Sequence, residues 1–205
     1  MAKNWEHDLE FKGASKLAKQ IGRIVVGEHK SFMAYQFAKQ ARNLPGDVAE
    51  FGVFMGATAK LIAYAVKGSG KKVHLFDTFE GLPQPTKPID IHNKGEFNVP
   101  FDKVEAFFQD TPEAVFHKGF FPDTTKGLEE LQYSFVHIDA DLYQSTLDGF
   151  DYFYPRMCKG GIILLDDYEW PHTPGVKKAV EEWMKDKPER IIVSSLDHQA
   201  FIIKV

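Results

Sequence analysis

The sequence predicts an α/β fold in which helices cover both faces of a mostly parallel, seven-stranded sheet that ends in an antiparallel hairpin. Apolar stretches of strand length alternate with stretches of helical spacing from residue 47 to residue 186, the pattern of a parallel sheet wound with helices. Two strand segments, in FVHIDADLY and GGIILLDDY, are continuous apolar runs, as buried parallel strands are. The last residues, RIIVSSLDHQAFIIKV, indicate two strands joined by a short turn.

The predicted elements follow in order along the chain. Residues 31–42 have apolar side chains at helical spacing, and strands and helices begin to alternate after Pro45-Gly46. We expect one domain over 1–205, in which 1–45 form an N-terminal helical extension and 46–205 form the core. The terminal hairpin is predicted to turn at Leu196-Asp197-His198. Strands are predicted at 47–53, 72–77, 114–118, 133–139 and 161–166, and helices at 57–67, 101–109, 143–154 and 175–186, with a short helix near 124–131.

The composition excludes several classes of protein. A formal net charge of −4 does not favour binding to nucleic acid or to an anionic membrane surface. No apolar run approaches the roughly 18 residues that a membrane-spanning helix needs, and the segment MAKNWEHDLE lacks the apolar core of a secretion signal. Cys158 is the only cysteine, so an internal disulfide cannot form. We therefore expect a cytoplasmic protein with a small-molecule ligand, and the composition is compatible with a homo-oligomer.

A glycine-containing turn follows the first predicted strand, in DVAEFGVFMGAT. Gly52 and Gly56 permit a tight turn and close approach of a ligand to the backbone, and the next helix offers free N–H groups. Asp77 ends the following strand, where an acid commonly binds ribose hydroxyls. The alternative is that the glycines serve only helix–strand packing. Because Glu50 would repel a pyrophosphate, a positively charged ligand such as S-adenosylmethionine fits this turn better than NAD.

Two pairs of acids stand where apolar strands end. Asp139 and Asp141 follow one strand, and Asp166 and Asp167 follow the next. Four carboxylates at neighbouring strand ends would repel one another unless a cation lies between them. Oxygen ligands alone select a hard cation such as Mg²⁺. The sequence thus predicts a divalent-metal site, with one carboxylate free to act as general base on a substrate hydroxyl.

Other interpretations of these residues stay open at this point. Asp141 or Asp167 could instead cap the helix that follows each of them. His137 lies within an apolar strand, which is typical of a core histidine with a hydrogen-bond partner. His172, in WPHTPG, could reach the acidic site from the loop after the second pair of acids.

Five segments, taken in order, resemble the macrocin O-methyltransferase family: DVAEFGVFMG, LFDTFEGLP, KGFFPDT, FVHIDADLYQST and GGIILLDDY. The resemblance covers roughly residues 45–185 and is most specific in DLYQST and DDY. It implies a Rossmann-like methyltransferase fold and methylation of sugar hydroxyls with S-adenosylmethionine and Mg²⁺. By analogy, the metal ligands are Asp139, Asp166 and Asp167, the general base is Asp141, the ribose-binding acid is Asp77, and the cofactor is further contacted by Glu50, Gly52, Gly56, Thr78, Gly119 and Asp139.

We therefore predict an S-adenosylmethionine- and metal-dependent O-methyltransferase that acts on a hydroxyl of a sugar or of another small natural product. A metal-dependent glycosyltransferase is one alternative, because Asp139-Ala140-Asp141 is also a D-x-D motif, although Glu50 disfavours a bound diphosphate. A noncatalytic protein that binds S-adenosylmethionine is the other alternative. Residues 78–100 form a long segment rich in Pro and Gly, and we expect it to be mobile without ligand and to close over cofactor and acceptor.

Overall fold

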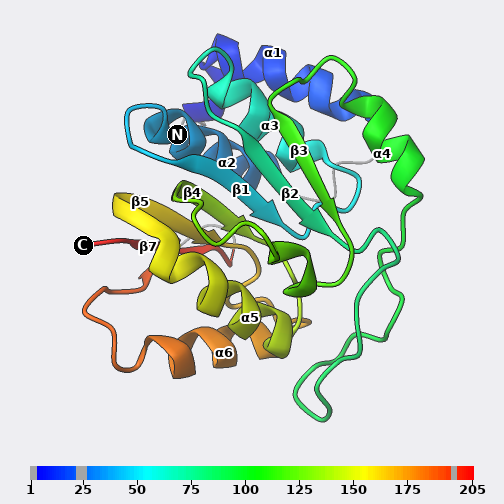
Figure 1. The fold of residues 1–205 in the computed structure, drawn as a ribbon, viewed down its shortest axis with the longest axis vertical. Helices are drawn as coiled ribbons and strands as arrows, with labels where there is room; N and C mark the ends of the chain where they lie inside the picture. Colours follow the sequence, from blue (N-terminus) through cyan, green and yellow to red (C-terminus); the bar gives the residue numbers. More distant parts are fainter. Residues whose placement is uncertain (1–3, 22–26, 195–197) are drawn as a thin grey trace.

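The computed structural model describes residues 4–21, 27–194 and 198–205. Its centre is a seven-stranded sheet with the order β3-β2-β1-β4-β5-β7-β6 (Figure 1). The strands are β1 (Asp47–Phe51), β2 (Val73–Asp77), β3 (Ala114–Lys118), β4 (Tyr133–Ile138), β5 (Met157–Leu165), β6 (Ile192–Val193) and β7 (Ala200–Ile203). The first five are parallel, whereas β7 pairs antiparallel with both β5 and β6. The predicted fold class is confirmed; the predicted turn at Leu196-Asp197 lies outside the described residues.

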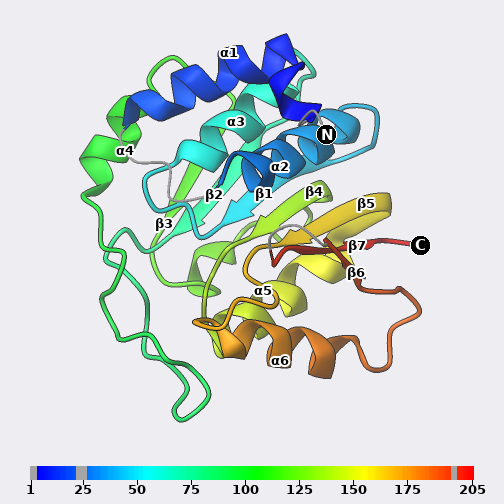
Figure 2. The same ribbon diagram turned by 180° about the vertical axis from the view of Figure 1, so that it is seen from behind.

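Helices cover both faces of the sheet, as Figures 1 and 2 show from opposite sides. One face carries α1 (Leu9–Ala18), α2 (Glu28–Ala41) and α3 (Ala57–Val66), and the other carries α5 (Tyr143–Phe153) and α6 (Pro174–Met184). Val104 of α4 (Phe101–Phe107) belongs to the apolar cluster of the first face. Because each face has its own apolar cluster, the central strands are buried on both sides, which explains the continuous apolar runs in β4 and β5.

Some boundaries differ from the predicted ones. The helix α1 lies within the helical extension expected over 1–45, but its bounds were not predicted; the Asp8 carboxylate caps it by accepting a hydrogen bond of 2.8 Å from the N–H of Phe11. Instead of a helix near 124–131 there is one 3₁₀ turn (Asp123–Thr125); the backbone is already extended at Lys126, and Gly127 follows with a φ of +85°. Further 3₁₀ turns lie at Asn4–Glu6, Lys19–Ile21 and Tyr154–Arg156.

The order of the strands reverses between β1 and β4. From β1 the chain runs outward to β2 and β3 and then returns to place β4 on the other side of β1. Ligands of such sheets bind beyond the carboxyl ends of the strands at this point. The loops that follow β1, β2, β4 and β5 therefore define where a site is expected. None of the helices in the described residues is long and apolar enough to cross a membrane.

Residues 78–100 contain no helix or strand and extend away from the sheet beyond α4 (Figure 1). A buried carboxylate attaches the segment to the second helical layer. Asp90 accepts a hydrogen bond of 2.9 Å from the N–H of Tyr143, the first residue of α5, and one of 2.7 Å from the N–H of Thr86. The segment is thus fixed at Asp90, and its mobility on either side of this point stays a prediction.

Candidate active site

A cavity of about 460 Å³ lies at the carboxyl ends of the parallel strands. The loops after β1, β2, β3, β4 and β5 all contribute to its lining, so residues far apart in the sequence meet there. The structure brings every predicted site residue to this one cavity: Glu50, Gly52, Gly56, Asp77, Thr78, Gly119, Asp139, Asp141, Asp166 and Asp167.

The turn after β1 depends on two glycines with positive φ. Gly52 has a φ of +90°, and a Cβ atom there would lie 1.8 Å from the carbonyl oxygen of Asp139. Gly56 has a φ of +83° at the start of α3, where a Cβ atom would lie 2.8 Å from the ring of Phe108. Packing alone therefore requires both glycines. Both also line the cavity, so the packing interpretation and the ligand-approach interpretation are compatible.

Asp77 holds the same turn in place. Its Oδ2 accepts hydrogen bonds from the N–H groups of Val53 (2.7 Å) and Phe54 (2.8 Å), and its Oδ1 accepts one of 2.7 Å from the N–H of Phe79. Each carboxylate oxygen has two lone pairs, so Oδ1 retains room for another donor. Asp77 thus holds the turn after β1 in place, and its contact with a ribose stays a prediction. Sequence reasoning did not reveal this backbone function.

Glu50 and His137 form a buried pair beneath the carboxylates. Glu50 Oε1 lies 2.8 Å from His137 Nδ1, and both side chains are almost completely buried. Burial is the main cause that raises the pKa of Glu50. Within the described chain, Glu50 Oε2 and His137 Nε2 have no hydrogen-bond partner. His137 is therefore the predicted core histidine with a partner, and its second nitrogen remains available.

The four acids group into two overlapping sets. Ligand oxygens of Asp139, Asp141 and Asp167 lie within 4.8 Å of one another. In the second set, His137 offers a nitrogen within 4.8 Å of oxygens of Asp139 and Asp166. Asp139 belongs to both sets, because its strand end lies between β1 and β5. The arrangement can bind a cation through the first set, through the second set, or through oxygens of both.

Crowding of these carboxylates disfavours their charged forms. Burial, followed by repulsion from Asp167 and Asp166, raises the pKa of Asp141 to about 8. Burial also raises the pKa of Asp139, and repulsion from Asp166 and Asp141 adds to it. The pKa of Asp167 is raised by burial and then by Asp166. A divalent cation among them would reverse these shifts by stabilising the charged carboxylates.

Two polar side chains that the sequence analysis missed contact these acids. Lys30, in the first turn of α2, donates hydrogen bonds to Asp166 Oδ2 (3.1 Å) and Asp167 Oδ1 (2.5 Å). Gln199, just before β7, donates a hydrogen bond of 2.9 Å to Asp166 Oδ1. Burial alone would lower the pKa of Lys30, but Asp166 and Asp167 outweigh it and raise that pKa. Both contacts are long-range, so no local sequence pattern marked them.

The capping interpretation of the acids is wrong. The N-cap residues of α5 and α6 are Leu142 and Thr173, and the acid that binds the first N–H of α5 is Asp90. Asp141 and Asp167 instead adopt left-handed backbone, with φ of +58° and +54°. Short polar side chains tolerate this conformation better than most others.

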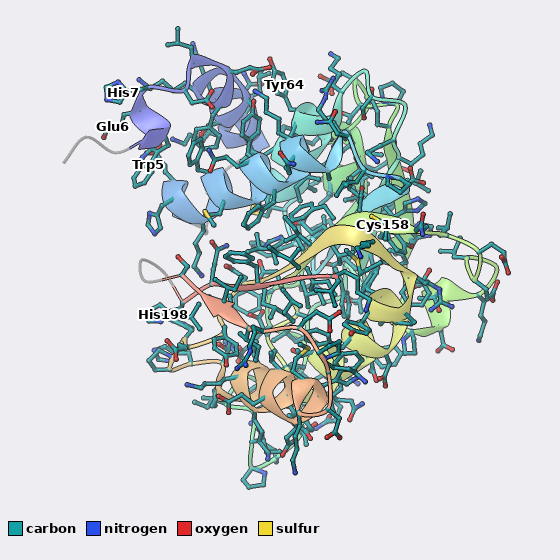
Figure 3. The ribbon with its side chains drawn as sticks, turned by 90° about the vertical axis from the view of Figure 1, so that its left-hand side faces the viewer. Trp5, Glu6, His7, Tyr64, Cys158 and His198 are labelled. Atoms are coloured by element: carbon teal, nitrogen blue, oxygen red, sulfur yellow. The ribbon has the colours of Figure 1, made fainter. Side chains whose placement is uncertain are left out.

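Aromatic side chains line the mouth of the cavity. Phe54 and Phe97 meet edge to face with 5.8 Å between their ring centroids. The ring centroids of Trp170 and His198 are 5.0 Å apart. Figure 3 shows His198 beside the C-terminal strands and Cys158 well away from it. His172, which could have reached the site, instead packs against Trp170 and is not among the lining residues.

A model of the macrocin O-methyltransferase family matches residues 21–203. The chain belongs to this family. It is 29% identical over 143 residues to the 8-demethyl-8-(2,3-dimethoxy-alpha-L-rhamnosyl)-tetracenomycin-C 4'-O-methyltransferase of Streptomyces olivaceus, covering 62% of this chain and 55% of the relative. It is 30% identical over 159 residues to the mycinamicin III 3''-O-methyltransferase of Micromonospora griseorubida, covering 68% and 61%. This family member thus spans somewhat more than half the length of these curated relatives.

Solved structures share the fold of this family member. The O-methyltransferase NovP matches it with a TM-score of 0.81 at 21% identity, over 98% of this chain and 99% of that chain. CalS11, a calicheamicin methyltransferase, matches with a TM-score of 0.71 at 19% identity, over 99% and 94%. An O-methyltransferase from Bacillus cereus, solved in complex with SAH, matches with a TM-score of 0.64 at 12% identity, over 96% and 91%. The Rossmann-like methyltransferase fold is therefore confirmed.

Proposed function

We propose that this protein is an S-adenosylmethionine- and divalent-metal-dependent O-methyltransferase that acts on a sugar hydroxyl of a natural product, with residues 1–205 as one catalytic domain. The observation that supports this most directly is that the carboxyl ends of β1 and β4 meet in one cavity. The glycine turn after β1 touches the backbone of Asp139, so a cofactor on that turn would lie next to the acid cluster. Methyl transfer requires this proximity, because donor carbon and acceptor oxygen must be within about 3–3.5 Å.

The charge of the cavity supports a sulfonium cofactor over a nucleotide sugar. Glu50, Asp77 and the four clustered acids line it, and Lys30 is the one Lys or Arg among its described lining residues. A negatively charged wall favours a cation such as S-adenosylmethionine and repels a diphosphate. The relatives that are named O-methyltransferases agree with this choice. A glycosyltransferase is correspondingly disfavoured.

The residues present fit a divalent cation. The donor set consists of carboxylate oxygens with one buried, unpartnered imidazole nitrogen nearby, His137 Nε2, and hard cations prefer such oxygen ligands. Asp139, Asp166 and Asp167 would hold the cation. When bound, it would supply Lewis acidity that lowers the pKa of an acceptor hydroxyl. Asp141 would then accept the hydroxyl proton, and the turn held by Asp77 would orient the methyl donor.

The aromatic mouth of the cavity would bind the acceptor. Exposed rings of Phe97, Phe120 and Trp170 border the acids and offer apolar faces on which a glycoside can pack. The names of the two relatives include a rhamnosyl compound and mycinamicin III, which agrees with a sugar-bearing acceptor.

The test is methyl transfer from S-adenosylmethionine labelled in its methyl group to a panel of glycosides with free sugar hydroxyls. We expect label in the sugar, loss of transfer in EDTA and recovery with excess Mg²⁺. Calorimetry with S-adenosylhomocysteine and with a nucleoside-diphosphate sugar would separate the two enzyme classes. Binding of the nucleotide sugar alone would contradict the proposal, and methyl transfer that persists in EDTA would remove the metal from it.

A further inference from the structure

Lys30 places one ammonium group against both acids that follow β5. Its side chain is only 14% exposed, and its Nζ lies 3.1 Å from Asp166 Oδ2 and 2.5 Å from Asp167 Oδ1. These carboxylates are two of the three that the proposed function assigns to a divalent cation. A lysine ammonium and a metal ion cannot use the same oxygen lone pairs at one time.

Lys30 contacts only two of the four clustered acids. Within the described chain, no side-chain or backbone group donates a hydrogen bond to the carboxylates of Asp139 or Asp141. The ammonium of Lys30 therefore lies on the Asp166–Asp167 side of the cluster and does not contact the other two acids. A divalent cation would neutralise more of the cluster than Lys30 does, so the acids bind it preferentially if Lys30 can withdraw.

Lys30 has both the space and the flexibility to withdraw. It lies in the first turn of α2 and lines the cavity of about 460 Å³. Four methylene groups separate its ammonium from the backbone, which lets the ammonium move while the helix stays in place. Asp166 meanwhile keeps the hydrogen bond from Gln199 to its other oxygen, which holds its orientation.

We propose that Lys30 is a resident counter-ion of the acid cluster and that a divalent cation held by both Asp166 and Asp167 displaces its ammonium from Asp166 Oδ2 and Asp167 Oδ1 as it binds. This inference rests on the proposed metal site. Lys30 stabilises the cluster in the metal-free protein and competes with the metal for its ligands. The cost of breaking its two ion pairs lowers the apparent affinity of the protein for the metal.

The test is the affinity for Mn²⁺, measured by electron paramagnetic resonance of the free ion on full-length, cofactor-free protein. Lys30→Met retains an unbranched apolar side chain but removes the charge. We expect it to bind Mn²⁺ about tenfold more tightly, because two charge-assisted hydrogen bonds no longer have to break. Lys39→Met is the matched control on the same helix, since Lys39 pairs with Glu10 on the surface, and it should leave the affinity unchanged.

Equal or weaker Mn²⁺ binding by Lys30→Met would overturn the inference and leave the metal site standing. Absence of Mn²⁺ binding by every variant, the unmodified protein included, would overturn the metal site and this inference together. If Lys30→Met fails to fold, a measurement on the unmodified protein tests the same inference. Acetylation of Lys30, quantified by peptide mass spectrometry, should rise when Mn²⁺ is bound, while that of Lys39 stays constant. Unchanged acetylation of Lys30 on the metal-bound protein would also overturn the inference.

Discussion

Asp141 is the acid of the cluster that the proposed function does not assign to the metal. Its ionisation state affects the rate of methyl transfer, because the proposed function makes it the acceptor of the hydroxyl proton. Burial and the neighbouring acids Asp167 and Asp166 raise its pKa to about 8. A carboxylate with a pKa near the working pH is a stronger base than an ordinary one. This raised pKa belongs to the cluster without a cation; with a divalent cation bound, Asp141 would be charged and able to accept a proton.

Asp141→Asn should retain binding of Mn²⁺ and S-adenosylhomocysteine and lose about 10²–10⁴-fold in turnover, the usual contribution of a positioned base. Asparagine is the suitable replacement because it tolerates the left-handed backbone at this position. Single-turnover methyl transfer and calorimetry measure the two effects separately. Asp148→Asn, on the surface of α5, is the control and should be near wild type. Full activity of Asp141→Asn would assign the base to another residue.

His117 predicts acid sensitivity of the fold away from the site. Burial, with a smaller contribution from His74, lowers the pKa of His117 to about 4, below its ordinary value of 6.5. The unfolded chain therefore binds a proton more readily than the folded one, so this contribution to stability is present above pH 6.5 and lost as the pH falls towards 4. Urea unfolding at a series of pH values should show a steeper loss for wild type than for His117→Gln. Parallel profiles would contradict the assignment.

At the scale of the element, the turn between β1 and α3 is the most constrained part of the site. Gly52→Ala should cost roughly 2–4 kcal/mol in the free energy of unfolding, since it combines a positive φ with a clash against the backbone of Asp139. Gly13→Ala is the matched control: Gly13 lies inside α1 with nothing within 4 Å of its added Cβ atom, so we expect a gain of about 0.5–1 kcal/mol. Urea unfolding measures both. Unchanged stability of Gly52→Ala would mean that the two strand ends can separate freely.

The strands that carry the acids could be predicted because strands that are buried on both faces appear in the sequence as continuous apolar runs. The apolar stretches of β4 and β5 continue to the carboxyl end of each strand, and the acids follow directly after that end. Shorter or less regular elements gave weaker signals. The helix α1 depends on a single cap at Asp8, and the helix expected near 124–131 does not form because the backbone is already extended at Lys126. Such effects of one residue are not visible in a periodic pattern.

At the scale of the whole molecule, the segment 78–100 contacts both the helix α5 and the cavity. Asp90 fixes its middle to α5, and Gly81, Leu82 and Pro83 line the cavity. We expect saturating Mg²⁺ and S-adenosylhomocysteine to increase hydrogen-exchange protection in this segment. Equal protection with and without ligands would show that the segment does not close.

Asp90→Ala should increase exchange of residues 86–92 and of the first turn of α5 even without ligand, because the N–H groups of Thr86 and Tyr143 lose their acceptor. The measurement is hydrogen exchange followed by mass spectrometry. Asp123→Ala, an exposed acid in a 3₁₀ turn, is the control and should leave these peptides unchanged. Exchange that stays at the wild-type rate in Asp90→Ala would mean that other contacts hold the segment.

Contacts between distant parts of the chain were beyond prediction. Lys30 lies 136 residues before Asp166, and Gln199 lies 33 residues after it. Neither position belongs to a motif, and each becomes part of the site only through the packing of α2 and β7 against β5. The acids that meet in the cavity could thus be predicted from local pattern, whereas the two side chains that hydrogen-bond to them could not.

The positions of these two partners set an order of arrival during synthesis on the ribosome. Chains are made from the amino end, so Lys30 is present long before the acids of β4 and β5 emerge. Gln199 and β7, which pairs with β5, follow the acids in the chain. Lys30 can therefore pair with Asp166 and Asp167 as soon as α2 packs against β5, before Gln199 is in place.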